Sequence, residues 1–146
     1  VPRPIARPSE LRKPTMATRF FIDYEWWQQS GKDIRVDIQQ ICSELGEDVL
    51  ELGSEAETYD WIDPETAQVQ PVSGVLYPFL RQCGSHPDFV NDRIPLTEAV
   101  FRALLAAGNR PMTPPELAAR TGRPADTILR TLSGRQVYKG LRPIDE

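Results

Sequence analysis

Residue types that often carry chemistry are sparse in this chain of 146 residues, which holds one histidine and two cysteines. His86 follows Cys83 by three positions, a spacing that two zinc ligands can share. Structural zinc sites need about four such ligands, however, and the other cysteine, Cys42, lies far away in the sequence. We therefore expect neither a metal site nor a cofactor.

Acidic side chains are dense between residues 44 and 65, and paired carboxylates can perform acid–base catalysis or hold a hard cation. The cluster consists of Glu44, Glu47, Asp48, Glu51, Glu55 and Glu57. Because their spacing is irregular, we interpret them as a solvated face. The sequence also lacks a phosphate-cradling glycine loop, a nucleophile elbow, a zinc-protease helix and a kinase signature. We expect that the protein is not an enzyme, and catalysis by this acidic cluster is the least favoured alternative.

The net charge of −4 is unevenly distributed along the chain. Residues 1–20 hold five basic and one acidic residue, residues 21–92 hold three basic and fifteen acidic, and residues 93–146 hold nine basic and five acidic. Salt screens such fields within about 8–10 Å. The basic C-terminal part can therefore approach phosphates while the acidic middle faces away.

The composition, with 40% hydrophobic and 26% charged residues, is that of an ordinary globular protein. No apolar run approaches the roughly 20 residues of a membrane span, so we expect no membrane partner. The chain also opens without the charged-then-apolar pattern of a secretory leader. Both cysteines lie in apolar runs, which favours reduced, buried thiols and a cytoplasmic protein.

The first part of the chain, residues 1–19, is rich in proline and arginine. Proline at this density blocks both helices and inner strands, so we expect an extended linker. The alternative is a basic arm that lies on phosphates or on a partner protein.

The second part, residues 20–92, is acidic and opens with an amphipathic helical pattern. Its apolar positions recur every three or four residues: Tyr24, Trp27, Gly31, Ile34, Ile38, Ile41 and Leu45. The pattern predicts a core face or a helix-pairing seam, capped by Asp23 and ended by Gly46, and Ser30-Gly31 can divide it into two helices. Neighbours on a helix point about 100° apart, so one of Trp26 and Trp27 is expected to pack elsewhere or bind a partner. We expect this part to serve dimerisation or docking.

Later in the same part, the pattern around Tyr59, Trp61 and Val69 predicts a β-hairpin whose turn is Asp63 to Thr66. A short helix is then predicted from the spacing of Val75, Leu76, Phe79, Leu80 and Cys83. Phe89 is expected to anchor the connector that follows.

The third part, residues 93–146, begins with a predicted helix that Thr97 caps and Gly108-Asn109 ends. Its buried stripe is expected to be Val100, Phe101, Leu104 and Leu105.

Two short helices are predicted within "MTPPELAARTGRPADTILRTLSG", residues 112–134. Thr113 and Glu116 have the spacing of a capping box. Ala118 is small where two helices cross closely, Gly122 supplies the positive φ of the turn, and Ile128 plugs the crossing. These offsets of four and six residues are those of a helix-turn-helix.

The segments "ELAARTG", "TILRTL" and "GRQVYKGLRPI" resemble the winged-helix superfamily over roughly residues 95–145. The resemblance implies a recognition helix from Pro124 to Ser133, followed by a wing. Val137, Tyr138 and Leu141 could form its strands, with Gly140 in or near a turn. The chain ends soon afterwards, so the wing is expected to be short, with one strand that pairs elsewhere.

The resemblance also implies DNA contacts. Arg130 could bind guanine bidentately, and Thr127 could touch a thymine methyl or a phosphate, with Thr131 on the same outward side. Phosphate contacts are expected from basic residues around the helix. These are Arg120, Arg123, Arg135, Lys139 and Arg142.

The predicted fold is mainly α with a small β-hairpin: an α+β N-terminal region followed by a winged helix-turn-helix domain. The predicted function is a DNA-binding protein, most simply a small transcription regulator that binds double-stranded DNA. The alternative is a non-enzymatic adaptor subunit of a larger nucleoprotein or protein complex, in which the winged helix and Trp26/Trp27 contact protein. Besides double-stranded DNA, a second copy of the chain or a larger protein complex is considered as a partner.

Overall fold

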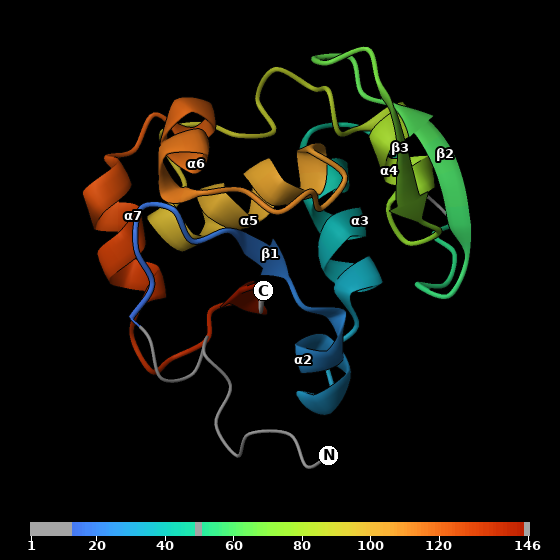
Figure 1. Ribbon diagram of the computed structural model, residues 1–146. Helices are drawn as coiled ribbons and strands as arrows, with labels where there is room; N and C mark the ends of the chain where they lie inside the picture. Colours follow the sequence, from blue (N-terminus) through green and yellow to red (C-terminus); the bar gives the residue numbers. More distant parts are fainter. Residues whose placement is uncertain (1–12, 49–50, 145–146) are drawn as a thin grey trace.

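The computed structural model describes residues 13–48 and 51–144. It is a mixed α and β fold, in which the described residues form six helices and two small antiparallel sheets of two strands each (Figure 1). Residues 1–12, which make up most of the expected proline-arginine arm, lie outside the described residues. In the part of the chain that is described, no helix is long and apolar enough to cross a membrane.

The predicted helical stripe forms two helices rather than one. Helix α2 (Tyr24–Gln29) begins at Asp23, whose side chain accepts from the backbone N–H of Glu25. The chain breaks at Gly31, where φ is +74°, and continues as α3 (Ile34–Glu44). Glycine adopts this left-handed conformation without the steric cost that a side chain would add. Of the predicted stripe, Trp27, Ile34, Ile38 and Ile41 are buried, Tyr24 and Leu45 are partly buried, and Gly31 is exposed. Gly46 follows α3 with φ +81°.

The predicted hairpin and the short helix after it are both present. Strands β2 (Thr58–Ile62) and β3 (Val69–Ser73) pair antiparallel, with Ile62 opposite Val69. Helix α4 (Tyr77–Gln82) follows, with its proline in the first turn. Figure 1 shows the hairpin at the right of the molecule with α4 behind it. Phe89 is buried, as expected for the anchor of the connector.

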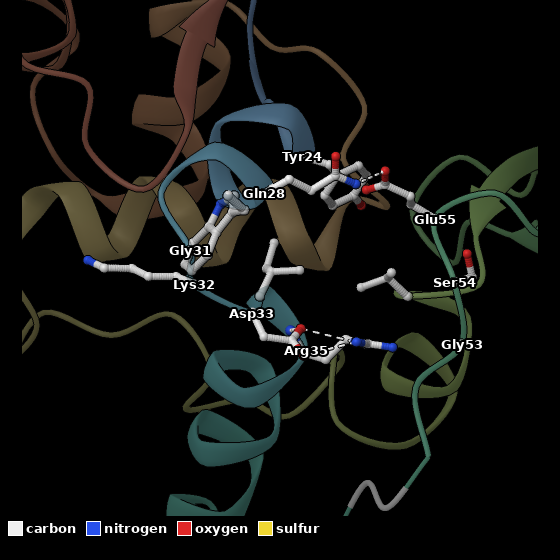
Figure 2. Close-up of a pocket in the computed structure, with 12 residues that line it drawn as sticks. Tyr24, Gln28, Gly31, Lys32, Asp33, Arg35, Gly53, Ser54 and Glu55 are labelled. Carbon is white, nitrogen blue, oxygen red and sulfur yellow. Dashed lines mark hydrogen bonds and ion pairs between the residues drawn. The ribbon is translucent and has the colours of Figure 1, made fainter.

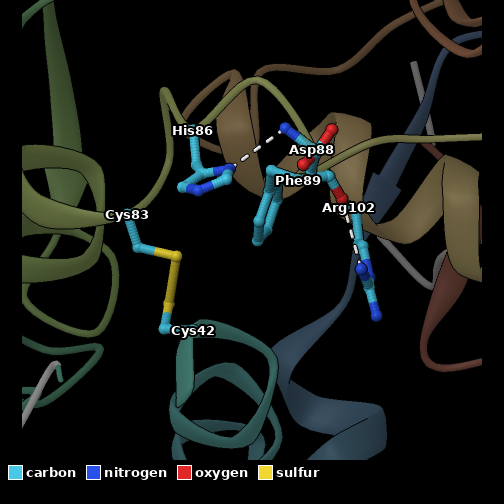
Figure 3. Close-up of a disulfide and its surroundings, with 6 residues drawn as sticks. All are labelled: Cys42, Cys83, His86, Asp88, Phe89 and Arg102. Atoms are coloured by element: carbon cyan, nitrogen blue, oxygen red, sulfur yellow. Dashed lines mark hydrogen bonds between the residues drawn. A yellow bond between two sulfur atoms is a disulfide. The ribbon is translucent and has the colours of Figure 1, made fainter. Parts of the chain in front are cut away.

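Cys42 at the end of α3 and Cys83 after α4 are joined in a disulfide (Figure 3). The expectation of reduced thiols is therefore wrong. Both residues are fully buried, as expected, but their Cα atoms lie 5.9 Å apart, within the range that a disulfide spans. Sequence spacing could not show this proximity, because the two cysteines are 41 positions apart in the chain. The expectation of a cytoplasmic protein rested on reduced cysteines and loses that support.

Helix α5 (Leu96–Ala106) lies at the centre of the core, and its predicted stripe of Val100, Phe101, Leu104 and Leu105 is fully buried. The prediction that Thr97 caps this helix is wrong. The N-cap residue is Pro95, whose carbonyl accepts from the N–H of Ala99, so the helix begins two residues earlier than a threonine cap at position 97 would allow.

A short N-terminal strand, β1 (Phe20–Ile22), lies beside α5 and pairs antiparallel with the last strand, β4 (Leu141–Pro143). The other edge of β1 is also occupied. Phe20 exchanges two backbone hydrogen bonds with Met112, and the side-chain amide of Asn109 bonds the N–H and the C=O of Ile22. Figure 1 shows β1 in the middle of the molecule, so residues from both ends of the described chain build its centre.

A single hydrophobic cluster runs through both the 20–92 and the 93–146 parts. Trp27, Ile38 and Phe79 from the first part pack in the same core as Phe101 and Ile128 from the second. The expected boundary between residues 92 and 93 is therefore not marked by a break in the core.

Candidate nucleic-acid interface

Two short helices joined by a tight turn form the predicted site. Helix α6 (Pro114–Thr121) opens with the predicted capping box, in which Thr113 Oγ1 accepts from Glu116 N at 3.4 Å and Glu116 Oε1 accepts from Thr113 N at 3.0 Å. The backbone hydrogen bond from Thr113 holds the pKa of Glu116 below its ordinary value. The helix ends at Gly122 with φ +72°, and α7 (Ala125–Leu132) follows directly.

The interior of this helix pair follows the predicted offsets. Ile128 is fully buried beside Leu117, while Ala118 is partly buried against the same core. The hydroxyl of Thr121 is satisfied locally, since it donates to Leu117 O at 2.8 Å. Residues 113–134 are thus a bent pair and not a straight rod (Figure 1).

The outer face of α7 carries a guanidinium that points into solvent. The Arg130 side chain is 76% exposed and lies 3.9 Å from Asp126, one helical turn earlier. Thr127 and Thr131 are partly buried next to it, and the hydroxyl of Thr131 donates to Thr127 O at 2.8 Å. Arg135, just beyond the helix, is exposed. Arg130 thus lies on the outward side of α7, as predicted, whereas Thr127 and Thr131 are only partly exposed there.

The other basic residues of the predicted interface make contacts within the protein. Both guanidinium nitrogens of Arg120 bond Glu65 in the hairpin turn, and Arg123 donates to the backbone carbonyl of Ile94. Arg142 forms an ion pair with Asp23 at 3.0 Å. Each of these head groups therefore has a partner within the protein, but a guanidinium carries five N–H donors, and the bonds of Arg123 and Arg142 do not use all of them.

Among the basic residues of the predicted interface, Lys139 has two carboxylate partners. Its ammonium contacts Asp37 Oδ2 at 3.0 Å and Glu98, and lies 4.9 Å from the centre of the Phe101 ring. Burial works to lower the pKa of Lys139, but the hydrogen bonds and charges of Glu98 and Asp37 outweigh it and raise the pKa above its ordinary value. This lysine connects the end of the chain to α3 and α5.

The residues expected to form a wing do not form a hairpin of their own. Val137 and Tyr138 lie in a loop, so their prediction as strand is wrong, whereas Leu141 begins β4 as expected. The loop is fixed to α2, because Trp27 Nε1 donates to Lys139 O at 2.9 Å and Asp23 N donates to Gly140 O at 2.8 Å. β4 pairs with β1, which agrees with the expectation of a strand paired elsewhere.

The two tryptophans expected at a partner-binding site have different environments. Trp27 is only 5% exposed and packs against Phe101, with ring centroids 5.6 Å apart. Trp26 is partly buried and meets the Trp27 ring edge-on at 5.4 Å. Only Trp26 therefore offers surface to a partner in this fold.

The residues weighed for metal or acid–base chemistry do not converge. Cys83 is bonded to Cys42 in the disulfide, and His86 Nδ1 accepts from the backbone N–H of Asp88 at 3.0 Å (Figure 3). No group of three or more His, Cys, Asp or Glu side chains in residues 13–48 and 51–144 could hold a metal ion. The clustered acids Glu44, Glu51, Glu55 and Glu57 are exposed.

Sequence reasoning did not identify the cavities among the described residues, and two of them are formed by several distant segments of the chain. One, of about 310 Å³, lies where α2 meets the residues before α3, and Figure 2 shows a Gln28–Glu55 hydrogen bond and an Asp33–Arg35 ion pair among the residues that line it. The other, of about 550 Å³, lies between the hairpin turn, the residues after α4, α5 and α6. Each is lined by segments that are distant in sequence, so no local spacing could indicate it. Comparison of the chain with protein-family models, curated proteins and solved structures gives no match.

Proposed function

We propose that the protein binds double-stranded DNA through α7, as the recognition helix of a helix-turn-helix related to the winged-helix type. The observation that carries this proposal is the position of Arg130. Its guanidinium is exposed on the outer face of α7, while Ile128 and Leu132 anchor the inner face in the core. A helix held in this way can enter a major groove with its outer face toward base edges.

The proposed interface is smaller than the sequence indicates. Arg130 is the base-reading residue, Arg135 contacts phosphate, and Thr127 and Thr131 border them. Asp126 would repel phosphate, but its ion pair with Arg130 partly neutralises it. Lys139, Arg142, Arg120 and Arg123 have partners within the protein. With few phosphate contacts, affinity will depend only modestly on salt, with a slope of about −0.9 per contact.

The proposal is tested by titrating mixed duplex DNA at several salt concentrations. Arg135→Ala should weaken binding to all sequences alike and reduce the salt slope by about one. Arg130→Ala should cost about 1–3 kcal/mol at the preferred sequence and relax sequence preference. Lys32→Ala, which removes an exposed charge from the N-terminal part, is the control. Absence of binding at roughly 50 mM salt would refute the proposal.

A protein-docking adaptor is the second candidate, because the outer face of the hairpin exposes apolar side chains. Ile62 is 66% exposed and its cross-strand neighbour Val69 is 63% exposed. Affinity capture from source cells, analysed for protein and nucleic acid together, distinguishes the two functions. An adaptor will retain partners that Ile62→Ser/Val69→Ser loses and Arg130→Ala keeps, whereas a DNA-binding protein will show the opposite pattern.

A further inference from the structure

The larger cavity has the size and lining of a small-molecule site. Its volume of about 550 Å³ lies within the range of roughly 300–1,000 Å³ typical of ligand pockets. Its apolar wall is contributed by four separate segments of the chain, through Trp61, Leu80, Phe89, Val90 and Ala106. A flat apolar body placed there would be in contact with aromatic and aliphatic groups.

Polar groups with defined hydrogen-bonding capacity also line the cavity. Arg120 presents its guanidinium from α6 and is bonded bidentately by Glu65 from the hairpin turn. His86 accepts a backbone N–H through Nδ1, which leaves its other ring nitrogen to carry the proton as a donor. The cavity thus combines apolar walls with the Arg120 cation and the His86 ring, beside the carboxylates of Glu65, which pairs with Arg120, and of Asp63, whose Oδ1 accepts from the backbone N–H of Glu65.

The Arg120–Glu65 pair is asymmetric in its burial. The Arg120 side chain is 23% exposed, whereas that of Glu65 is 59% exposed and sits in a surface turn. An exposed carboxylate contributes little net stability to such a pair, because water solvates it nearly as well. A ligand carboxylate can therefore take its place with the same fork-to-fork geometry while its body fills the apolar cavity.

We propose that this cavity binds a small monocarboxylate with a flat apolar body, whose carboxylate replaces that of Glu65 on Arg120. The site is separate from the outer face of α7, so it stands independently of DNA binding. Glu65 acts as an internal competitor that occupies Arg120 when no ligand is bound. This competition makes a specific prediction: removal of the Glu65 carboxylate should increase the affinity of the cavity for a carboxylate ligand.

The probes for the experiment are 2-naphthoate and its uncharged analogue 2-naphthamide. Each is titrated into the full chain by calorimetry, with the indole N–H signal of Trp61 followed by NMR. Naphthoate should bind about tenfold more tightly than naphthamide, because a bidentate bond to Arg120 is charge-assisted. Arg120→Gln should remove this difference, and Glu65→Gln should increase naphthoate affinity several-fold. Arg135→Gln, which changes an exposed arginine outside the cavity, should change neither affinity.

A second variant tests the location of the site without altering the ion pair. Ser85 lines the cavity and is exposed, so Ser85→Trp should block entry of both probes while the near-ultraviolet circular dichroism retains a folded spectrum. The proposal is overturned if naphthoate binds no more tightly than about 1 mM, a threshold that corresponds to roughly −4 kcal/mol. Equal affinities for the two probes, or weaker naphthoate binding to Glu65→Gln, would overturn it as well.

Discussion

Lys139 Nζ lies 3.0 Å from Asp37 Oδ2, in an ion pair that joins residues 102 positions apart. The same ammonium contacts Glu98, and Glu98 accepts a second bond from Arg102 Nε at 2.8 Å. Arg102 also donates to Phe89 O at 3.3 Å (Figure 3). This network of four charged residues fixes the loop before β4 against α3 and α5.

Removal of the Lys139 ammonium should destabilise the protein. Lys139→Met leaves Asp37 and Glu98 with one cation fewer, and loss of one partner from a buried pair costs roughly 3–5 kcal/mol. Lys139 is about one-third exposed, so we expect only about 1–3 kcal/mol less unfolding free energy in urea. Lys32→Met, at an exposed lysine with no ion pair among the described residues, is the control. Equal effects of the two substitutions would contradict the role assigned to the network.

Stability should decrease at acidic pH partly through Glu98. Burial works to raise the pKa of Glu98, but the hydrogen bonds and charges of Lys139 and Arg102 outweigh it and hold the pKa below its ordinary value. A carboxyl with a lowered folded-state pKa stabilises the fold fully above its unfolded pKa of about 4.3. That contribution is lost as the pH falls through the lower folded-state value. Glu98→Gln should therefore flatten the decline of unfolding free energy below about pH 4, measured by urea titration at each pH.

The disulfide should contribute measurably to stability. Closure of a loop with a sequence separation of 41 residues restricts the unfolded chain, and the usual contribution of a disulfide is about 2–4 kcal/mol. Reduction should lower the urea midpoint accordingly, with circular dichroism as the readout. If the disulfide were absent, both cysteines would react with a thiol reagent when the protein is unfolded without reductant, and that result would contradict the prediction.

Two glycines with similar backbone angles should respond differently to alanine. Gly122 has φ +72° with open space around it, so Gly122→Ala carries only the left-handed conformational cost of about 1–2 kcal/mol. Gly140 has φ +77°, and a Cβ there would lie 2.9 Å from Asp23 O and 3.1 Å from the Trp27 indole. Gly140→Ala should therefore destabilise the protein more than Gly122→Ala, as measured by thermal unfolding. Similar losses of stability for the two variants would show that the loop around Gly140 moves away from the added methyl group at no cost in free energy.

Features decided within a few residues were predictable from the sequence. The capping box of Thr113 and Glu116 and the turn at Gly122 each depend on one short segment and on the conformational preferences of its residues. The bend at Gly31 follows from the same local rules. Thr97 is the exception, because a hydroxyl near a helix start does not determine which residue becomes the cap.

Features that depend on tertiary contacts were not predictable. Neither the Cys42–Cys83 bond nor the β1–β4 pairing has a local signature, since each joins segments that only the folded core brings together. For the same reason, the sequence could not show which basic residues of the candidate interface are free to contact DNA. Basic residues near α7 suggest phosphate contacts, but only the fold shows that Arg120 bonds Glu65 while Arg130 remains exposed.

The pairing of β1 with β4 also constrains when the molecule can fold during synthesis. Phe20 is translated before its partner Pro143, which lies 123 positions later in the chain. Until then one edge of β1 has unpaired backbone groups, and the indole of Trp27 lacks its acceptor on Lys139. A nascent chain that stalls before Lys139 is added should remain open to proteases and chaperones.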